Sequence, residues 1–189
     1  FELVYEFNVA IVVFLGPPGA GKGTQAKKLS DYFGWKHLST GDLLRTEVEN
    51  QTKLGLLANE FMQKGDLVPD NIIINMISNV LEQKNSGIVL DGFPRTIDQA
   101  KSLNNSLDNL KKKINKVLFI DVEESKIISR LTKRGRKDDD PEVIINRLKT
   151  YSQLTQPLIS FYENEGLIEK INGNGNEETV FNELLGIVS

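Results

Sequence analysis

Short apolar runs recur along the chain, and longer stretches whose apolar residues follow a helical spacing separate them. Five runs have the length and composition of β-strands, and they cover residues 9–15, 36–38, 87–91, 116–121 and 167–171. Several are apolar at consecutive positions, which is typical of strands buried on both faces of a parallel sheet. The pattern therefore predicts an α/β fold, with a five-stranded parallel sheet sandwiched by helices through right-handed crossovers.

Residues that begin and end helices place the elements between these strands. A helix over 21–33 ends before Gly34, and a second helix, over 70–82, follows a proline. At 140–142 the order Asp, Pro, Glu supplies an N-cap residue, a proline in the first position and an acidic first turn. The helix that begins there is long, and we expect Pro157 to kink it. We expect it to have one apolar face, formed by Ile144, Leu148, Tyr151, Leu158 and Tyr162.

Length and composition limit the classes of protein that the chain can represent. It has 189 residues, the size of one compact domain, and 39% hydrophobic with 26% charged residues exclude a disordered chain. The net charge of −3 is small and of the wrong sign for a general nucleic-acid or anionic-membrane binder, so we expect neither partner. The sequence has no cysteine, which excludes disulfides, thiol nucleophiles and Cys-ligated zinc, and we expect oxygen ligands for any metal.

The apolar runs are too short for a membrane span of about 20 residues. Residues 1–8 lack a starting methionine, a cationic segment and a small-residue cleavage pattern, so they do not resemble a secretory signal. We interpret them as a remnant of truncation or of a tag. A sequence without cysteine suits a reducing compartment, and we expect a cytoplasmic protein.

The strongest chemical signal lies between the first strand and the helix that follows it. Residues 16–24 read Gly-Pro-Pro-Gly-Ala-Gly-Lys-Gly-Thr. Glycines let main-chain N–H groups wrap a phosphate chain, the helix N-terminus adds partial positive charge, and Lys22 supplies a mobile point charge. The sequence therefore predicts a phosphate-binding loop. The loop departs from the general pattern G-x-x-x-x-G-K-[ST], because Gly23 follows the lysine and Thr24 comes one residue later.

One carboxylate and several arginines are placed to act on a bound polyphosphate. Asp91 ends the third strand, at the edge where open α/β sheets bind ligands. Arg130 and Arg134 are four residues apart and share a helix face. Arg147 lies on or beside the buried face of its helix, where a charge requires an anionic partner.

Two further arginines, Arg95 and Arg136, complete a set of guanidiniums that suits phosphate oxygens. In the alternative interpretation, Arg134 and Arg136 only complement a helix C-terminus or pair with the aspartates at 138–140. The single histidine, His37, lies at the end of a short strand beside Trp35 and Leu38, and it is interpreted as a packed or capping residue.

Together these motifs resemble those of the adenylate kinase family. The shared motifs are Gly-Lys-Gly-Thr in the phosphate loop, Leu-Ser-Thr-Gly-Asp-Leu-Leu-Arg at 38–45, Gly-Asp-Leu-Val-Pro at 65–69, Leu-Asp-Gly-Phe-Pro-Arg-Thr at 90–96 and the later arginines. They follow the family's order over residues 11–175. The resemblance implies a P-loop NTPase-type fold and the reaction MgATP + AMP ⇌ MgADP + ADP. It also implies Mg²⁺ as cofactor, no zinc, and a monomer whose ligands are ATP, AMP and ADP.

The resemblance further implies that a single domain, 1–189, has three parts. These are a core (9–38, 69–132 and 141–189), a flap that binds the nucleoside monophosphate (39–68) and a short LID (133–140). Some relatives have a long LID with four zinc-binding cysteines, which this sequence lacks.

By the same resemblance, the family's site residues are carried to their matching positions. The catalytic set is Lys22, Arg95, Arg134, Arg136 and Arg147. The ATP-binding set is Gly16, Gly19, Ala20, Gly21, Lys22, Gly23, Thr24, Arg130, Arg134 and Gly175. The AMP-binding set is Thr40, Arg45, Asp66, Leu67, Val68, Gly92, Phe93, Pro94, Arg95, Gln99, Arg136 and Arg147. Asp91 and Thr24 are expected to hold Mg²⁺ through water, with its other ligands coming from ATP and solvent.

Alternative functions differ from this one in residues that can be checked. A uridylate/cytidylate kinase is the nearest rival, but in the family Thr and Gln at the positions of Thr40 and Gln99 accompany AMP kinases, whereas pyrimidine-specific relatives carry Ala and Asn. A GTPase switch would need the motif N-K-x-D, and residues 115–118 end in leucine. A non-catalytic nucleotide-binding module would not need the full arginine set.

Overall fold

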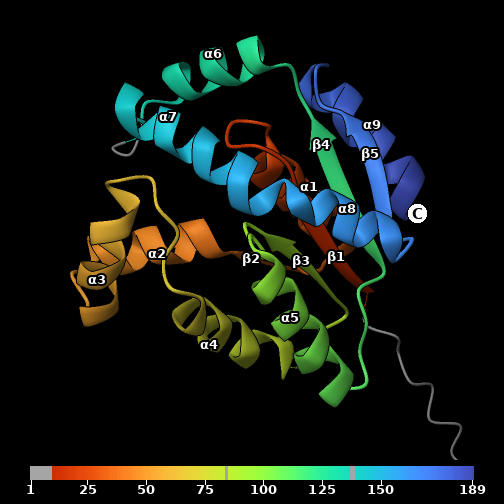
Figure 1. Cartoon of the computed structure of the whole chain (residues 1–189). Coiled ribbons are helices and arrows are strands. Elements are labelled where there is room, and N and C mark those ends of the chain that lie inside the picture. Colours follow the sequence, from red (N-terminus) through yellow and green to blue (C-terminus); the bar gives the residue numbers. More distant parts are fainter. Residues whose placement is uncertain (1–9, 84, 137–138) are drawn as a thin grey trace, which may run out of the picture.

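The computed structural model describes residues 10–83, 85–136 and 139–189. Its strands form one all-parallel sheet in the order β2-β3-β1-β4-β5 (Figure 1), which confirms the predicted fold class. The strands are β1 (Ala10–Leu15), β2 (Lys36–Ser39), β3 (Gly87–Asp91), β4 (Lys116–Asp121) and β5 (Ile168–Asn172). The predicted ends of β2 and β5 differ from these by one residue. The interpretation of 1–8 and the predicted start at Val9 lie outside the described residues.

Helices cover both faces of this sheet (Figure 1). They are α1 (Lys22–Phe33), α2 (Thr40–Glu49), α3 (Lys53–Met62), α4 (Asp70–Leu81), α5 (Ile97–Asn109), α6 (Glu124–Arg134), α7 (Pro141–Thr150), α8 (Pro157–Asn164) and α9 (Glu177–Val188). A π-helical turn, Tyr151–Thr155, precedes α8. Among the described residues, no helix has both the length and the apolar composition to cross a bilayer.

Two apolar cores lie on opposite faces of the sheet, and β1 contributes to both. Val13 packs in one core with residues of α4, α5 and α8, whereas its neighbour Phe14 packs in the other with residues of α1, α6 and α9. Successive side chains of a strand point to opposite faces, so a strand buried on both faces must be apolar at every position. This explains the consecutive apolar residues that the sequence shows.

The strand register brings the ligand-binding edge together. Phe14 of β1 is level with Asp91 of β3, so Asp91 lies beside the loop that begins at Gly16. β1 occupies the centre of the sheet, with β3 on one side and β4 on the other. The chain reverses its direction of winding here, and a crevice outside the carboxyl ends of the strands is the usual ligand site in such sheets.

The helix that begins at Pro141 differs from the prediction in one respect. Asp140 caps it as predicted, since its side chain accepts a hydrogen bond from the Glu142 main-chain N–H. The expected single apolar face is wrong: Ile144 packs in the core with α1, α6 and α9, whereas Leu158 and Tyr162 pack in the core with α4 and α5. The π-helical turn before Pro157 changes the phase of the helix, so α7 and α8 present their apolar residues to different cores.

Helices α2 and α3 lie beyond the edge strand β2 and pack closely against each other (Figure 1). Sequence analysis placed no helix at 40–62, although two caps mark the starts: the Ser39 side chain accepts from the Asp42 N–H, and the Thr52 side chain accepts from the Gly55 N–H. At Gly55 a β-carbon would lie 1.9 Å from the Glu47 carbonyl oxygen, so this crossing requires glycine.

We expect Gly55→Ala to destabilise the protein by about 1–3 kcal/mol, because the added methyl would force α3 away from α2. Chemical denaturation measures this change in the free energy of unfolding. Gly186→Ala in α9 is the matched control, since no heavy atom lies within 4 Å of its added β-carbon and alanine favours a helix. Equal stability of the two variants would contradict the close packing at Gly55.

Candidate active site

A cleft of about 690 Å³ opens at the carboxyl edge of the sheet. Most of the residues predicted to contact phosphate or metal line it. They are Gly19, Ala20, Gly21, Lys22, Gly23, Thr24, Arg45, Asp91, Gly92, Arg95, Arg130, Arg134, Arg136, Arg147 and Gly175. The structure thus brings together side chains that are far apart in the sequence.

The phosphate loop packs so closely against β4 and α6 that two of its positions have no room for a side chain. A β-carbon at Gly16 would lie 2.7 Å from the Ile120 carbonyl oxygen of β4, and one at Gly19 would lie 2.8 Å from Leu131 of α6. Both glycines also have positive φ angles. The loop leads directly into α1, whose first turn has no acidic residue and whose N-terminus therefore keeps its partial positive charge.

Lys22 is turned onto the loop that carries it. Its Nζ donates to the carbonyl oxygens of Gly16 and Pro17, at 2.8 Å each. The pKa of Lys22 is lowered to about 8, mainly because the group is buried; Asp91 opposes this change, and nearby arginines add to it. The ammonium group is therefore poorly compensated, which favours an incoming anion.

Asp91 lies next to this lysine and is 8% exposed. A β-carbon at Gly23 would be 3.3 Å from its Oδ2, so glycine after Lys22 keeps the space beside the carboxylate open. The Nε2 of His37 is 3.8 Å from the same oxygen, and His37 lies in β2 opposite Val89 of β3. Among residues 10–83, 85–136 and 139–189, no group of three or more His, Cys, Asp or Glu side chains is arranged to hold a metal ion.

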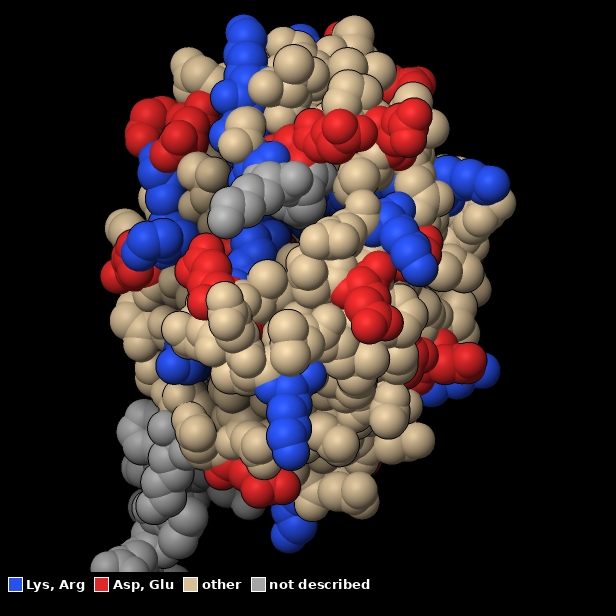
Figure 2. Space-filling model, turned by 90° about the vertical axis from the view of Figure 1, so that its left-hand side faces the viewer, with Lys and Arg blue, Asp and Glu red and all other residues tan. Residues whose placement is uncertain are grey.

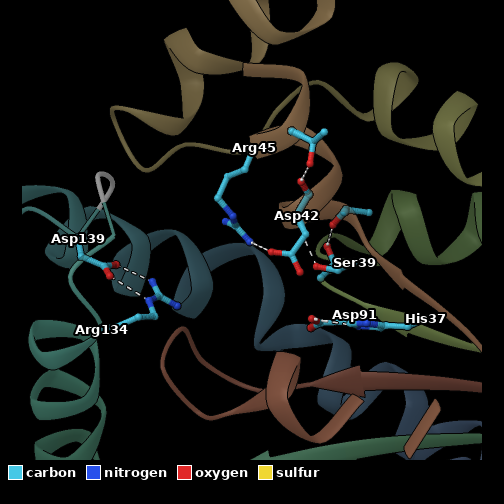
Figure 3. A network of polar contacts seen from close by, with 10 residues as sticks. His37, Ser39, Asp42, Arg45, Asp91, Arg134 and Asp139 are labelled. Atoms are coloured by element: carbon cyan, nitrogen blue, oxygen red, sulfur yellow. Dashed lines mark hydrogen bonds and ion pairs between the residues drawn. The ribbon is translucent and has the colours of Figure 1, made fainter. Parts of the chain in front are cut away.

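Asp139 organises the arginines on the other side of the cleft (Figure 3). Its carboxylate accepts two hydrogen bonds from Arg134, at 2.9 and 2.5 Å, and a third from the Arg136 main-chain N–H. The Nη1 of Arg147 lies 3.3 Å from Asp139 Oδ1. Burial alone would raise the pKa of Asp139, but these hydrogen bonds and charges outweigh burial and lower it. Arg134 therefore pairs with one of the aspartates at 138–140, as the alternative interpretation held. It also lines the cleft. Lys137 and Asp138 lie outside the described residues.

Arg130 connects two loops at the edge of the cleft. Its guanidinium donates to the Gly173 carbonyl at 2.9 Å and contacts the Ala20 carbonyl at 3.4 Å. The phosphate loop and the turn after β5, where Gly175 lies, are thereby joined. Sequence reasoning placed Arg130 at the site but missed its contact with Gly173.

A smaller pocket of about 70 Å³ adjoins the cleft. Predicted AMP-binding residues line it: Thr40, Arg45, Asp66, Leu67, Val68, Gly92, Arg95, Gln99 and Arg147. Arg45 reaches it from α2 and is paired with Asp42 (Figure 3). Thr40 Oγ1 and Arg95 Nε both donate to the Gly92 carbonyl, at 2.9 and 2.7 Å. Burial lowers the pKa of Arg95, and Asp91 opposes this effect.

Three predicted residues lie outside these two pockets. Gly16 and Pro94 line a third pocket of about 80 Å³, which also includes Lys22 and Arg147. Phe93 is 2% exposed and packs in the core with α4 and α5, so its side chain is not available to a ligand. Sequence reasoning also missed apolar residues of the smaller pocket. These are Leu44, Met62 and Ile73, of which Leu44 could have been found from its position four residues after Thr40 on one helix.

The smaller pocket is bounded where residues 64–66 approach α7. The Asn146 side-chain amide donates to the Lys64 carbonyl at 2.5 Å and to Asp66 Oδ1 at 2.9 Å. At Gly65 a β-carbon would meet the Val143 carbonyl and the Arg147 side chain at 2.9 Å. Arg147 is thereby held against both pockets.

Charges of both signs are mixed on the surface around the cleft. Figure 2 shows acidic and basic side chains interspersed over the face that includes α2, α3 and α7. With a net charge of −3, the cationic character is local to the cleft.

Comparison with known proteins agrees with this geometry. The family profile described as "Adenylate kinase" matches residues 14–167. A protein named "Adenylate kinase" from Prochlorococcus marinus (strain NATL2A) is 47% identical over 170 residues, which cover 90% of this chain and 93% of that protein. A protein of the same name from Leptospira biflexa serovar Patoc (strain Patoc 1 / Ames) is 43% identical over 92% of this chain and 97% of its own length. Another, from Methanothrix thermoacetophila, is 42% identical over 94% of this chain and 98% of its own length. The chain belongs to the adenylate kinase family.

Proposed function

We propose that the chain transfers the γ-phosphoryl group of ATP reversibly to AMP, giving two ADP. One observation carries the proposal: the cleft and the smaller pocket share Arg45, Arg95 and Arg147. Two nucleotides bound in adjoining pockets would have their phosphates at this shared boundary. Guanidiniums there can neutralise the charge on the transferring group, which is the main task of a phosphoryl-transfer enzyme.

ATP would occupy the cleft, with its phosphates in the loop at 16–24. The main-chain N–H groups and Lys22 would hold the phosphates, and Arg130 and Gly175 would lie toward the adenine. AMP would occupy the smaller pocket, with its phosphate on Arg45 and Arg95 and its base near Thr40 and Gln99. An oxygen of the AMP phosphate would then attack the γ-phosphorus in line, while Arg134, Arg136 and Arg147 stabilise the transferring group.

We also propose the division into core, flap (39–68) and short LID (133–140). The position of α2 and α3 beyond the sheet edge supports the flap, and the Gly135 cap that ends α6 supports a LID that begins near this point. Closure of both segments over the nucleotides would exclude water, which would otherwise hydrolyse ATP.

Mg²⁺ is the cofactor that fits the residues at the cleft. Asp91 presents a carboxylate into space that Gly23 keeps open, and the exposed Thr24 follows. These two residues would hold the ion through water, with no zinc involved. When bound, Mg²⁺ neutralises charge on the ATP phosphates.

The proposal extends to the form in which the protein acts. We propose a cytoplasmic monomer that binds ATP, AMP and ADP and no nucleic acid or membrane. The mixed charges in Figure 2 and the small negative net charge support the absence of a nucleic-acid partner.

We expect AMP to be preferred over UMP and CMP by more than about 10²-fold in kcat/KM, because a mismatched base leaves buried polar groups unpaired. Chromatography of the products from MgATP with each monophosphate measures this preference. Gln99→Ala should reduce the preference through AMP affinity and leave ATP binding intact. Phosphorylation of UMP or CMP as fast as AMP would favour the pyrimidine kinase instead.

We expect kcat/KM for ATP to fall above a pH of about 8, because kcat/KM reports ionisations of the free enzyme and Lys22 loses its proton there. Bound phosphates favour the ammonium form, so the corresponding fall in kcat should occur at higher pH. Initial rates across pH 6–10 measure both profiles. Lys22→Met is the control: it should be at least about 10²-fold slower, and its remaining rate should not show this fall. An unchanged profile in the variant would assign the ionisation to another group.

Arg134 should act on the transferring group more than on binding. We expect Arg134→Met to lower kcat far more than it raises KM for either nucleotide, because an interaction made mainly in the transition state affects kcat. Lys149→Met, an exposed cation on α7, is the control and should leave both constants unchanged. An effect of Arg134→Met on KM alone would make this arginine a binding residue.

A further inference from the structure

A buried hydrogen-bond network surrounds Gln99 at the back of the smaller pocket. Gln99 is 2% exposed. Its Oε1 accepts from the Arg95 main-chain N–H at 2.7 Å, and its Nε2 donates to Asp70 Oδ1 at 2.6 Å. Asp70 is the first residue of α4 and comes two residues after Val68, which lines the same pocket with Asp66 and Leu67.

These two bonds leave half of the amide available to a ligand. A carboxamide has two N–H donors and two acceptor lone pairs, so one donor and one acceptor remain. Adenine presents the complementary N6 amino donor and N1 acceptor. Hypoxanthine, the base of IMP, presents the reverse, an O6 acceptor and an N1–H donor. The orientation of the Gln99 amide therefore decides which of these two purines it can bind.

Asp70 acts on that orientation through its charge state and its contacts. An ionised carboxylate only accepts hydrogen bonds, so it can face the NH₂ group of Gln99 but repels its oxygen. The second carboxylate oxygen lies 3.4 Å from Thr96 Oγ1, and that hydroxyl also accepts from the Gln99 main-chain N–H at 3.1 Å. Asp70 thus contacts both the helix cap of α5 and the side chain that follows it.

We propose that Asp70 is a positioning residue that sets the acceptor-base selectivity by holding the Gln99 amide in the orientation that reads adenine. This inference rests on the proposed function and adds a residue that does not itself contact the base. The Arg95 N–H binds the oxygen of the amide, and Asp70 binds its NH₂ group. A rotation of the amide by 180° would place the NH₂ group against the Arg95 N–H donor and the oxygen against the Asp70 carboxylate. Loss of Asp70 removes one of these two restraints and allows the reversed amide, which can accept hypoxanthine.

The test compares AMP with IMP as acceptor in Asp70→Leu, which keeps the approximate size of the side chain and removes the acceptor. We expect KM for AMP to rise about tenfold and the AMP to IMP ratio of kcat/KM to fall about tenfold or more, the scale for one hydrogen bond to a charged group. KM for ATP should change less than about twofold. Asp70→Asn keeps an acceptor oxygen and should recover most of the AMP preference.

Asp98→Leu is the matched control. Asp98 is exposed, carries the same charge and also lies in the first turn of its helix, one residue before Gln99. It should leave the AMP to IMP ratio of kcat/KM unchanged.

Thermal unfolding of Asp70→Leu, Asp70→Asn and Asp98→Leu compares their stability. The side-chain amide resonances of Gln99, assigned by their loss in Gln99→Glu, give a readout besides activity. Their exchange with solvent should accelerate in Asp70→Leu only.

The outcomes separate this inference from the proposed function. An unmodified enzyme that does not phosphorylate AMP would contradict the proposed function and, with it, the inference. An unmodified enzyme that phosphorylates AMP but does not prefer it over IMP would overturn the inference alone. If the unmodified enzyme prefers AMP and Asp70→Leu retains that preference with unchanged Gln99 resonances, the proposed function stands and the inference is overturned. A fall in kcat together with equal rises in KM for both nucleotides would also overturn it, because that result indicates general structural damage.

Discussion

Positive charge held at partly buried positions in the cleft is the constraint on which the rest of the structure depends. Burial lowers the pKa of Lys22 and of Arg95, because removal from water disfavours the charged form. The protein stabilises them mainly with main-chain carbonyls, at Gly16, Pro17 and Gly92. Only a few carboxylates, chiefly Asp91 and Asp139, add negative charge. The cleft therefore stays complementary to a polyanion, whereas full pairing with acidic residues would leave it neutral.

The parts of the site that could be predicted from the sequence are those with local physical causes. The phosphate loop is contiguous, and its glycines, lysine and helix start act on one another over nine residues. Asp91 could be placed because the end of a buried strand marks the ligand edge of a parallel sheet. Arg147 could be expected at the cleft because a guanidinium on or beside the buried face of a helix needs an anionic partner, and the structure places it in the lining of the cleft.

What the sequence could not predict are contacts between segments and the phase of helices. The bond between Gln99 and Asp70 depends on rotamers and on how α4 meets α5. A pairing of Arg134 with one of the aspartates at 138–140 was among the alternatives, but its assignment to Asp139 could not be made from the sequence. The burial of Phe93 depends on which side of its loop faces the core. The apolar residues of 144–162 fit one helical face by spacing, yet a change of helix type divides them between two cores.

The π-helical turn at Tyr151–Thr155 has a consequence for changes in chain length. An α-helix rotates about 100° per residue, and a π turn accommodates one residue more than an α turn. Within this turn the Thr155 hydroxyl donates to the Arg95 carbonyl at 2.8 Å, which ties the segment to the site. Deleting one residue here would therefore leave a continuous α-helix in which Arg147 keeps nearly its present orientation relative to Leu158 and Tyr162. If all the present residues formed a continuous α-helix instead, Arg147 would rotate by about 100° relative to these two residues, and either the arginine would leave the cleft or the two core residues would leave their core. The π turn is therefore what lets one segment serve both the cleft and the core at its present length.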